Sequence, residues 1–240
     1  MSSAVPTSPA PRLPLPVFSW THTAVTAVAR GLAFTLYSLE VRGRENLPAG
    51  EPCLLCANHT SHADTFALAT AAGGASRRLV FLGAHDYFSR LRWRGVLLRR
   101  MICLGQFDRR GSVAAAAHNL HLLETCRDDG RIVVLFPEGT RSVDGRMAKF
   151  KHGAAMFADR LGLRIIPCRI EGTHASLPKG QWFPRPWPLR VTFCAPVTVP
   201  PGPAGETGAA RADRYAAFMA GLQDQVARLG ATGPEPTLAP

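Results

Sequence analysis

A histidine and an aspartate lie close together in the polar stretch Asn58-His59-Thr60-Ser61-His62-Ala63-Asp64. An imidazole that donates one ring nitrogen to a carboxylate keeps its second nitrogen free to act as a general base. On one continuous helix, residues 59 and 64 would point about 140° apart. The two side chains meet only if the chain bends, with His59 in a turn and Asp64 in the first turn of a helix. The alternative is a loop whose Asn, Thr and Ser side chains cap the next helix.

A second polar cluster, Pro137-Glu138-Gly139-Thr140-Arg141-Ser142, also follows an apolar run. That run, residues 131–136, is rich in β-branched residues and predicts a buried strand. The first cluster likewise follows the apolar run 53–57, and the alanine-rich segment after it predicts a helix that ends at Gly73-Gly74. Because sites in α/β proteins usually lie at the ends of strands, the two clusters are expected to be two halves of one site.

Several catalytic signatures are absent from the chain: the phosphate-binding loop, the dinucleotide-binding glycine motif, the nucleophile elbow and the His-Glu-x-x-His zinc motif. A histidine base without a protein nucleophile suits direct transfer, in which a substrate hydroxyl attacks an activated acyl group. Arg109 and Arg141 are suited to hold a phosphate by forked hydrogen bonds. Glu138 is suited to accept from hydroxyls or from a backbone amide.

Predicted strands and helices alternate along the chain. This indicates an α/β fold: a single domain with a mixed central β-sheet flanked by helices and preceded by an N-terminal membrane-associated helix. Further apolar runs predict strands at Leu79–Leu82, Leu163–Ile170 and Leu189–Phe193. Pro167 lies in the second of these and predicts a sheet edge or a bulge. Helices are expected from Ser112 to Cys126, before Gly162, and from Arg211 to Leu229.

The chain is expected to have five segments. They are a disordered leader at 1–16, an apolar helix at 17–40, the α/β domain at 41–200, a linker and C-terminal helix at 201–230, and a disordered tail at 231–240. Residues 17–39 are long enough to cross a bilayer. Arg30 disfavours crossing, because a charge inside a spanning helix costs about 2.5–3.5 kcal/mol on insertion scales. A helix in the membrane interface is therefore favoured over a spanning helix and over an ordinary core helix.

The formal charge is +11, from 28 Lys and Arg against 17 Asp and Glu. Such an excess favours anionic partners, whether phosphates, lipid head groups, acidic carrier proteins or nucleic acid. Residues 85–111 hold seven arginines among aromatic and aliphatic residues, which suits either a surface meeting phosphates and apolar chains or a solvated helix face. The six cysteines lie mostly in apolar runs, and no second pair or histidine follows Cys53 and Cys56 at zinc spacing. Buried thiols in a reducing cytosol are therefore expected.

The two polar clusters resemble the lysophospholipid acyltransferase family, which includes the 1-acylglycerol-3-phosphate acyltransferases. Residues 58–64 match the family's N-H-x-S-x-x-D block, and residues 136–142 match its F-P-E-G-T-R-S block in full. Gln106–Arg109 is similar to the second block and Ile165–Cys168 to the fourth. The predicted strand end and turn at Val41–Pro48 resembles the lead-in. The blocks occur in family order over roughly residues 37–200.

The resemblance implies a role for each matched residue. His59 would deprotonate the acceptor hydroxyl and Asp64 would orient His59, while His62, a rival base, occupies a variable position of its block. Pro167 and its neighbours would shape a substrate pocket. The expected substrate-binding residues are Asn58, Ser61, Arg109, Glu138, Gly139, Thr140 and Arg141. The chain departs from the family by having Phe107 before Asp-Arg and a further arginine, Arg110, after it, which leaves open which arginine meets phosphate.

The resemblance also implies the reaction. A fatty acyl group would pass from acyl-CoA or acyl carrier protein to the free hydroxyl of a lysophospholipid, with 1-acylglycerol-3-phosphate as the expected acceptor and phosphatidic acid as the product. No metal and no cofactor beyond the acyl donor is expected. The expected location is the cytoplasmic face of the membrane, as a monotopic or peripheral protein that does not bind nucleic acid.

Two alternatives remain from the sequence. The same chemistry would serve another lipid or a specialised-metabolite hydroxyl. A non-enzymatic binder of anionic membrane or nucleic acid would account for the charge of +11 but would leave the pattern at 58–64 without a role.

Overall fold

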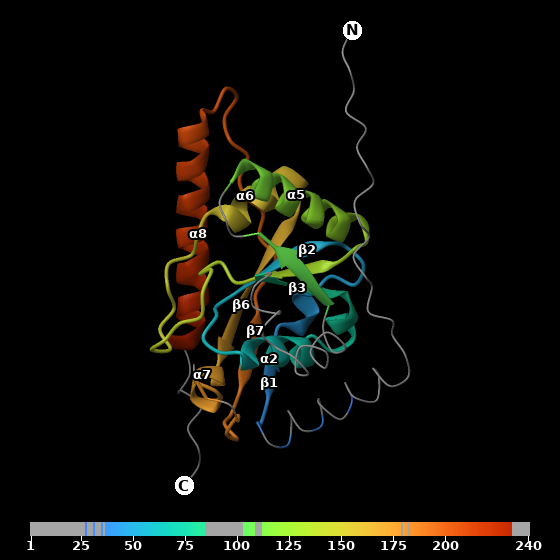
Figure 1. Ribbon diagram of the computed structural model, residues 1–240, viewed down its shortest axis with the longest axis vertical. Coiled ribbons are helices and arrows are strands. Elements are labelled where there is room, and N and C mark those ends of the chain that lie inside the picture. Colours follow the sequence, from blue (N-terminus) through green and yellow to red (C-terminus); the bar gives the residue numbers. More distant parts are fainter. Residues whose placement is uncertain are drawn as a thin grey trace.

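Seven strands form one sheet, with helices on both of its faces (Figure 1). The computed structural model describes residues 37–84, 103–108, 112–178, 180–181 and 183–231, together with Ala27, Gly31 and Thr35. The strands are β1 Glu40–Arg42, β2 Cys53–Ala57, β3 Leu79–Ala84, β4 Cys103–Phe107, β5 Ile132–Leu135, β6 Arg164–Glu171 and β7 Arg190–Phe193. The helices are η1 Arg44–Asn46, α2 Ala63–Ala71, η2 Gly73–Arg78, α5 Val113–Asp128, α6 Gly153–Leu161, α7 Thr173–Ser176 and α8 Gly208–Ala231.

Several predicted segments fall outside these residues. They are the leader at 1–16, most of the apolar helix at 17–40, most of the arginine-rich segment 85–111, and positions 232–240 of the tail. Within the described part of the chain, no helix is both long enough and apolar enough to cross a membrane.

The strand order is β1-β7-β6-β2-β5-β3-β4. The neighbours β6, β2, β5, β3 and β4 run parallel, whereas β7 is antiparallel to β6 and parallel to β1. The predicted mixed sheet flanked by helices is therefore confirmed. Register places Cys56 opposite both Leu135 and Pro167, so the carboxyl ends of the three central strands lie at one edge of the sheet. Both polar clusters begin at that edge.

The core is divided between the two faces of the sheet. Successive side chains of a strand point to opposite faces, so Leu55 packs with α2 on one face while Leu54 packs with α5, α6 and α8 on the other. Leu54 and Leu55 are both 0% exposed, and burying each contributes about 1.5–3 kcal/mol. Because β2 is covered on both faces, its sequence is continuously apolar rather than alternating.

Local signals account for the ends of two helices. Ser112 begins α5 as predicted, since its Oγ accepts from the Ala115 amide at 3.1 Å. Gly162 ends α6 in the left-handed conformation, with φ of 63°, as its position after the helix predicted.

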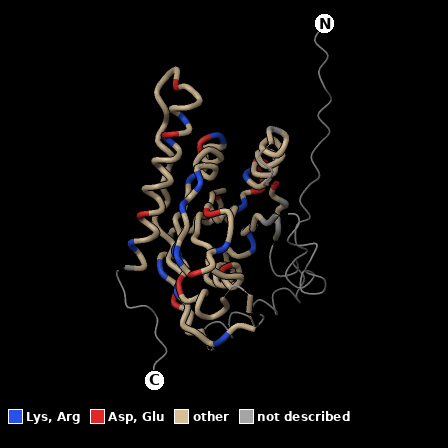
Figure 2. Tube along the Cα trace, turned by 60° about the vertical axis from the view of Figure 1, so that its left-hand side comes forward, with Lys and Arg blue, Asp and Glu red and all other residues tan. Residues whose placement is uncertain are grey.

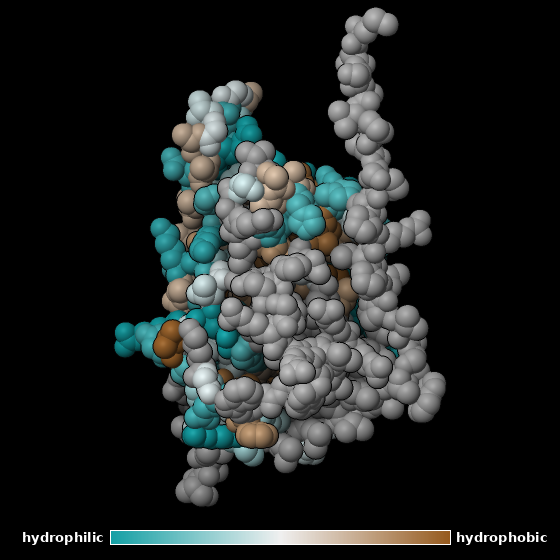
Figure 3. Space-filling view, viewed as in Figure 1, coloured by the Kyte–Doolittle hydropathy of each residue, from teal (hydrophilic) through white to brown (hydrophobic). Residues whose placement is uncertain are grey.

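The C-terminal helix α8 extends slightly beyond the predicted 211–229 at both ends. Its buried residues recur three or four positions apart, at Tyr215, Met219, Leu222 and Val226. Its exposed residues are a mixture of alanines and glycines with polar or charged residues (Figure 3). Basic and acidic residues are interspersed along several described elements rather than gathered on one (Figure 2).

Pro167 lies in the interior strand β6, between β7 and β2, so the edge position that the sequence allowed is wrong. The alternative, a bulge, is confirmed. Cys168 pairs with Phe193 and Ile165 with Val197, so three steps along β6 correspond to four along the opposite segment. The Pro167 carbonyl accepts from the Cys194 amide at 2.8 Å on that side. The missing N–H of Pro167 therefore faces the irregular part of the ladder, where it interrupts no regular pairing.

All six cysteines are free and buried, as predicted. Burial raises the pKa of Cys53, Cys56 and Cys126 to about 12, which leaves almost no thiolate at neutral pH. We expect the native protein to resist alkylation by iodoacetamide at pH 8 and to take up six carbamidomethyl groups after unfolding in urea, as counted by mass spectrometry. Rapid alkylation of the folded protein would contradict the burial of these thiols.

Candidate active site

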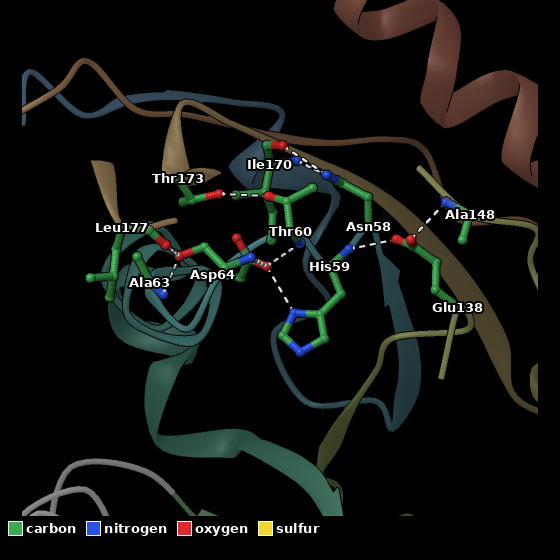
Figure 4. Close-up of polar contacts among 11 residues, drawn as sticks. Asn58, His59, Thr60, Ala63, Asp64, Glu138, Ala148, Ile170, Thr173 and Leu177 are labelled. Carbon is green, nitrogen blue, oxygen red and sulfur yellow. Dashed lines mark hydrogen bonds and ion pairs between the residues drawn. The ribbon is translucent and has the colours of Figure 1, made fainter. Parts of the chain in front are cut away.

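The turn between β2 and α2 brings His59 and Asp64 together (Figure 4). His59 Nδ1 lies 2.8 Å from Asp64 Oδ2, and the backbone amides of Thr60 and Ser61 donate to the same oxygen at 2.8 and 2.9 Å. Asp64 is the second residue of α2, whereas His59 lies in the preceding turn. The bend that the spacing required is therefore confirmed.

Phe136 and the second cluster, which follows it, hold His59 from three directions. The Phe136 ring stacks on the imidazole, with centroids 3.9 Å apart and planes inclined by 13°. Glu138 Oε1 accepts from the His59 amide at 2.6 Å, and the Ser142 amide donates to the His59 carbonyl at 2.9 Å. Together with Asp64, these contacts leave the imidazole little freedom to turn.

The partners of His59 also determine which ring nitrogen is available. An ionised Asp64 only accepts, so His59 Nδ1 carries the proton and Nε2 presents a lone pair. The His59 side chain is 17% exposed and that of Asp64 is 0% exposed. The imidazole is therefore partly exposed, while the carboxylate behind it is shielded from solvent.

Asp64 is stabilised mainly through one of its two oxygens. Oδ1 is buried and has no hydrogen-bond partner among the described residues, whereas Oδ2 accepts all three bonds. The position of Asp64 in the first turn of α2 adds the favourable field of the helix N-terminus. A buried carboxylate needs such compensation, because desolvation of an unpaired charge is costly.

Asn58 and Ser61 have protein partners in the structure. The Asn58 side chain forms a pair of hydrogen bonds with the backbone of Ile170, at 2.9 and 2.8 Å. Ser61 Oγ donates to the Leu177 carbonyl at 2.7 Å and accepts from the Ala63 amide at 3.0 Å. Both residues are 1% exposed. Their side chains fasten the turn to the end of β6, at Ile170, and to Leu177 just after α7. Their predicted contact with substrate stays a prediction.

The sequence did not indicate the partner of Thr60. Its Oγ1 lies 3.1 Å from Thr173 Oγ1, and Thr173 is fully buried at the start of α7. The two threonines are 113 positions apart, and no local pattern marks Thr173. The stacking of Phe136 on His59 was likewise missed, although Phe136 belongs to the matched block.

Of the remaining predicted binding residues, Gly139 makes the turn after Glu138. It has φ of 78°, and its amide donates to the Phe136 carbonyl at 2.9 Å. The positive φ favours glycine at this position, and a Cβ would also displace the end of the Lys151 side chain. Thr140 is exposed and Arg141 is half-buried. Arg109 lies outside the described residues.

Arg141 places positive charge near His62 and Asp64. Burial lowers its pKa, and the Asp64 carboxylate opposes that shift. Desolvation, followed by the charge of Arg141, lowers the pKa of His62 to about 4, so His62 is neutral at physiological pH. Burial raises the pKa of Glu138, against the effect of the Ala148 and His59 amides.

This arrangement is suited to deprotonating a hydroxyl beside an anionic group. The hydroxyl of Ser61 is a poor candidate for a nucleophile, because it donates to the Leu177 carbonyl. In the described part of the chain, no three His, Cys, Asp or Glu side chains gather as a metal site. The available chemistry is a base acting on a substrate hydroxyl.

The family model described as Acyltransferase matches residues 38–171, more than half of the chain and both polar clusters. The chain belongs to the acyltransferase family. The resemblance drawn from the sequence is thereby confirmed.

Other members of the family are similar over much of this chain. A 1-acyl-sn-glycerol-3-phosphate acyltransferase of Chlamydomonas reinhardtii is 33% identical over 151 residues, covering 60% of this chain and 42% of that protein. A chloroplastic 1-acyl-sn-glycerol-3-phosphate acyltransferase of Brassica napus is 30% identical over 149 residues, covering 62% of this chain and 41% of that protein. The chain thus spans about two fifths of the length of these relatives.

Among solved structures, the 1-acyl-sn-glycerophosphate (LPA) acyltransferase PlsC of Thermotoga maritima superposes with a TM-score of 0.59 at 25% identity. The match covers 88% of this acyltransferase and 82% of that chain. The likeness therefore extends over most of both proteins and is not limited to the two blocks.

Proposed function

We propose that this acyltransferase moves a fatty acyl group from acyl-CoA or acyl carrier protein to the free hydroxyl of 1-acylglycerol-3-phosphate, forming phosphatidic acid. The observation that carries the proposal is the His59–Asp64 pair, in which Asp64 engages Nδ1 rather than Nε2 and Arg141 lies near the carboxylate. The names of the Chlamydomonas, Brassica and Thermotoga relatives support the choice of acceptor. The acyl donor is a co-substrate, and no metal or resident cofactor takes part.

The proposed reaction needs one base and no covalent enzyme intermediate. His59 Nε2 takes the proton from the acceptor hydroxyl as its oxygen attacks the thioester carbonyl. The tetrahedral intermediate then collapses to the ester and expels the thiolate. The imidazolium returns its proton to that thiolate, which leaves as the free thiol. Asp64 orients the imidazole throughout and stabilises its protonated form.

Arg141 is proposed to bind the acceptor phosphate, together with Arg109. We expect Arg141→Ala to raise the KM for 1-acylglycerol-3-phosphate about 10–100-fold, because a charge-assisted hydrogen bond contributes about 1.5–3 kcal/mol. The KM for the acyl donor should change less than about twofold, as measured by varying each substrate against a saturating concentration of the other. Arg127→Ala, on the surface of α5, is the control. Equal rises in both KM values would argue against the phosphate role.

The proposed reaction is tested by incubating the purified protein with 1-acylglycerol-3-phosphate and either donor. Thiol release accompanied by phosphatidic acid in the mass spectrum is the expected result. A panel of other lysolipids and hydroxyl acceptors identifies a different acceptor if this one fails. No thiol release with any acceptor, together with tight binding to liposomes or DNA, would instead support a non-enzymatic binder.

Contact with a membrane surface, at its cytoplasmic face, is part of the proposal. Its support is the lipid nature of the proposed acceptor and the net charge of +11. Co-sedimentation with anionic vesicles, weakened by salt and absent with neutral vesicles, is the expected behaviour.

A further inference from the structure

Both carboxylate oxygens of Glu138 are engaged by the protein's own backbone. Oε1 accepts from the His59 amide at 2.6 Å, and Oε2 accepts from the Ala148 amide at 2.8 Å (Figure 4). The residue is 4% exposed. One carboxylate therefore joins the turn after β2 to the far end of the loop after β5.

The charge of Glu138 also disfavours contact with the phosphate of the proposed acceptor. An anionic carboxylate repels a phosphate, and the repulsion grows where water is excluded. To bind a substrate hydroxyl, an oxygen of Glu138 would have to share or lose its bond to a backbone amide. The loss would leave a buried N–H without a partner.

The position of Glu138 follows from the register of the sheet. Cys56 in β2 pairs with Leu135 in β5, and His59 and Glu138 each follow three positions later. Beyond Cys56 and Leu135, the last residues paired between β2 and β5, the side chain of Glu138 links the two segments by its hydrogen bond to the His59 amide. The turn at Gly139 then brings the Ser142 amide to the His59 carbonyl, so the peptide groups on both sides of His59 are held.

We propose that Glu138 is a positioning residue, which fixes the backbone of His59 so that its imidazole meets the acceptor hydroxyl, and that Glu138 contacts no substrate. This inference rests on the proposed function of His59 as the base. A general base must lie within hydrogen-bond reach of the proton that it removes. A displacement of about 1 Å is enough to lower a rate about 100-fold.

Two variants of Glu138 separate the length of the side chain from its charge. Glu138→Gln keeps the shape but offers one acceptor and one NH2 group, so one of the two amides faces a donor. Glu138→Asp keeps the charge but is one methylene shorter, so it cannot span both amides. We expect both to lower kcat about 100-fold while the KM for the acceptor stays within about twofold. Glu124→Gln, on the exposed surface of α5, is the matched control and should retain full activity.

Two kinetic results would overturn the proposal. One is a raised acceptor KM with unchanged kcat in Glu138→Gln, which is expected of a substrate ligand. The other is full recovery of kcat in Glu138→Asp, which would show that charge alone matters. Rates are expressed per folded molecule, so a purely structural role would lower the melting temperature and leave kcat unchanged.

A second measurement needs neither turnover nor a folded variant. In the wild-type protein, the His59 amide proton should resonate downfield and exchange slowly with solvent, as expected for a bond to a buried carboxylate. A rapidly exchanging His59 amide would refute the positioning role even if Glu138→Gln failed to fold. The wild-type protein could fail to acylate 1-acylglycerol-3-phosphate while the His59 amide stayed protected from exchange. That result would refute the proposed function but not the hydrogen bond by which Glu138 positions His59.

Discussion

His59→Ala is expected to lower kcat by about 10²–10⁴-fold, the range that a general base contributes. The variant keeps the turn, because the bonds from the Thr60 and Ser61 amides to Asp64 do not involve the imidazole. It loses the stacking on Phe136 and the bond from Nδ1. The transfer rate under saturating substrates is the measurement, with circular dichroism to show that the fold persists.

Two other histidines make this prediction specific. His121→Ala, on the exposed surface of α5, is the control and should retain the wild-type rate. His62→Ala tests the rival base and should change kcat by less than about fivefold, because the structure places His59 against the Asp64 carboxylate. Near-normal turnover in His59→Ala, combined with loss of turnover in His62→Ala, would reverse the assignment.

Asp64→Asn is expected to lower kcat on the order of 10³-fold with the chain still folded. A carboxamide fills the same space, but it is neutral and either presents an NH2 group to Nδ1 or accepts more weakly. The imidazole then loses both the tautomer and the stabilised positive charge that the proposed reaction uses. The kcat of the purified variant with saturating acceptor and donor checks the expectation.

Asp64→Ala should differ from Asp64→Asn in its stability. Removing the carboxylate leaves the Thr60 and Ser61 amides without their acceptor, at about 1–3 kcal/mol for each buried donor. We therefore expect a lower free energy of unfolding in urea for Asp64→Ala than for Asp64→Asn. A fully active Asp64→Asn would show that orientation by a charged carboxylate is dispensable.

Much of the fold follows from local patterns in the sequence. The apolar runs at 53–57 and 131–136 became β2 and β5 because both faces of these strands are covered. Ser112 and Gly162 marked helix ends because they satisfy backbone groups locally. The order of the strands is not local, since it depends on which buried faces pack together. The interior position of Pro167 was therefore not predictable, and the choice between an edge and a bulge required the pairing of β6 with β7 and the segment after it.

The sequence by itself indicated the residues that we propose carry the chemistry. The spacing of His59 and Asp64 required a bend, and the order of the two blocks indicated the family. Only the tertiary structure decided what holds these residues in place. The bond from the His59 amide to Glu138 joins positions 79 apart, and the contact of Thr60 with Thr173 joins positions 113 apart. Contacts at such separations depend on the register of β2, β5 and β6, which no local pattern specifies. For the same reason, the sequence left open whether Glu138 would accept from hydroxyls or from a backbone amide, whereas the fold directs its carboxylate to the amides of His59 and Ala148.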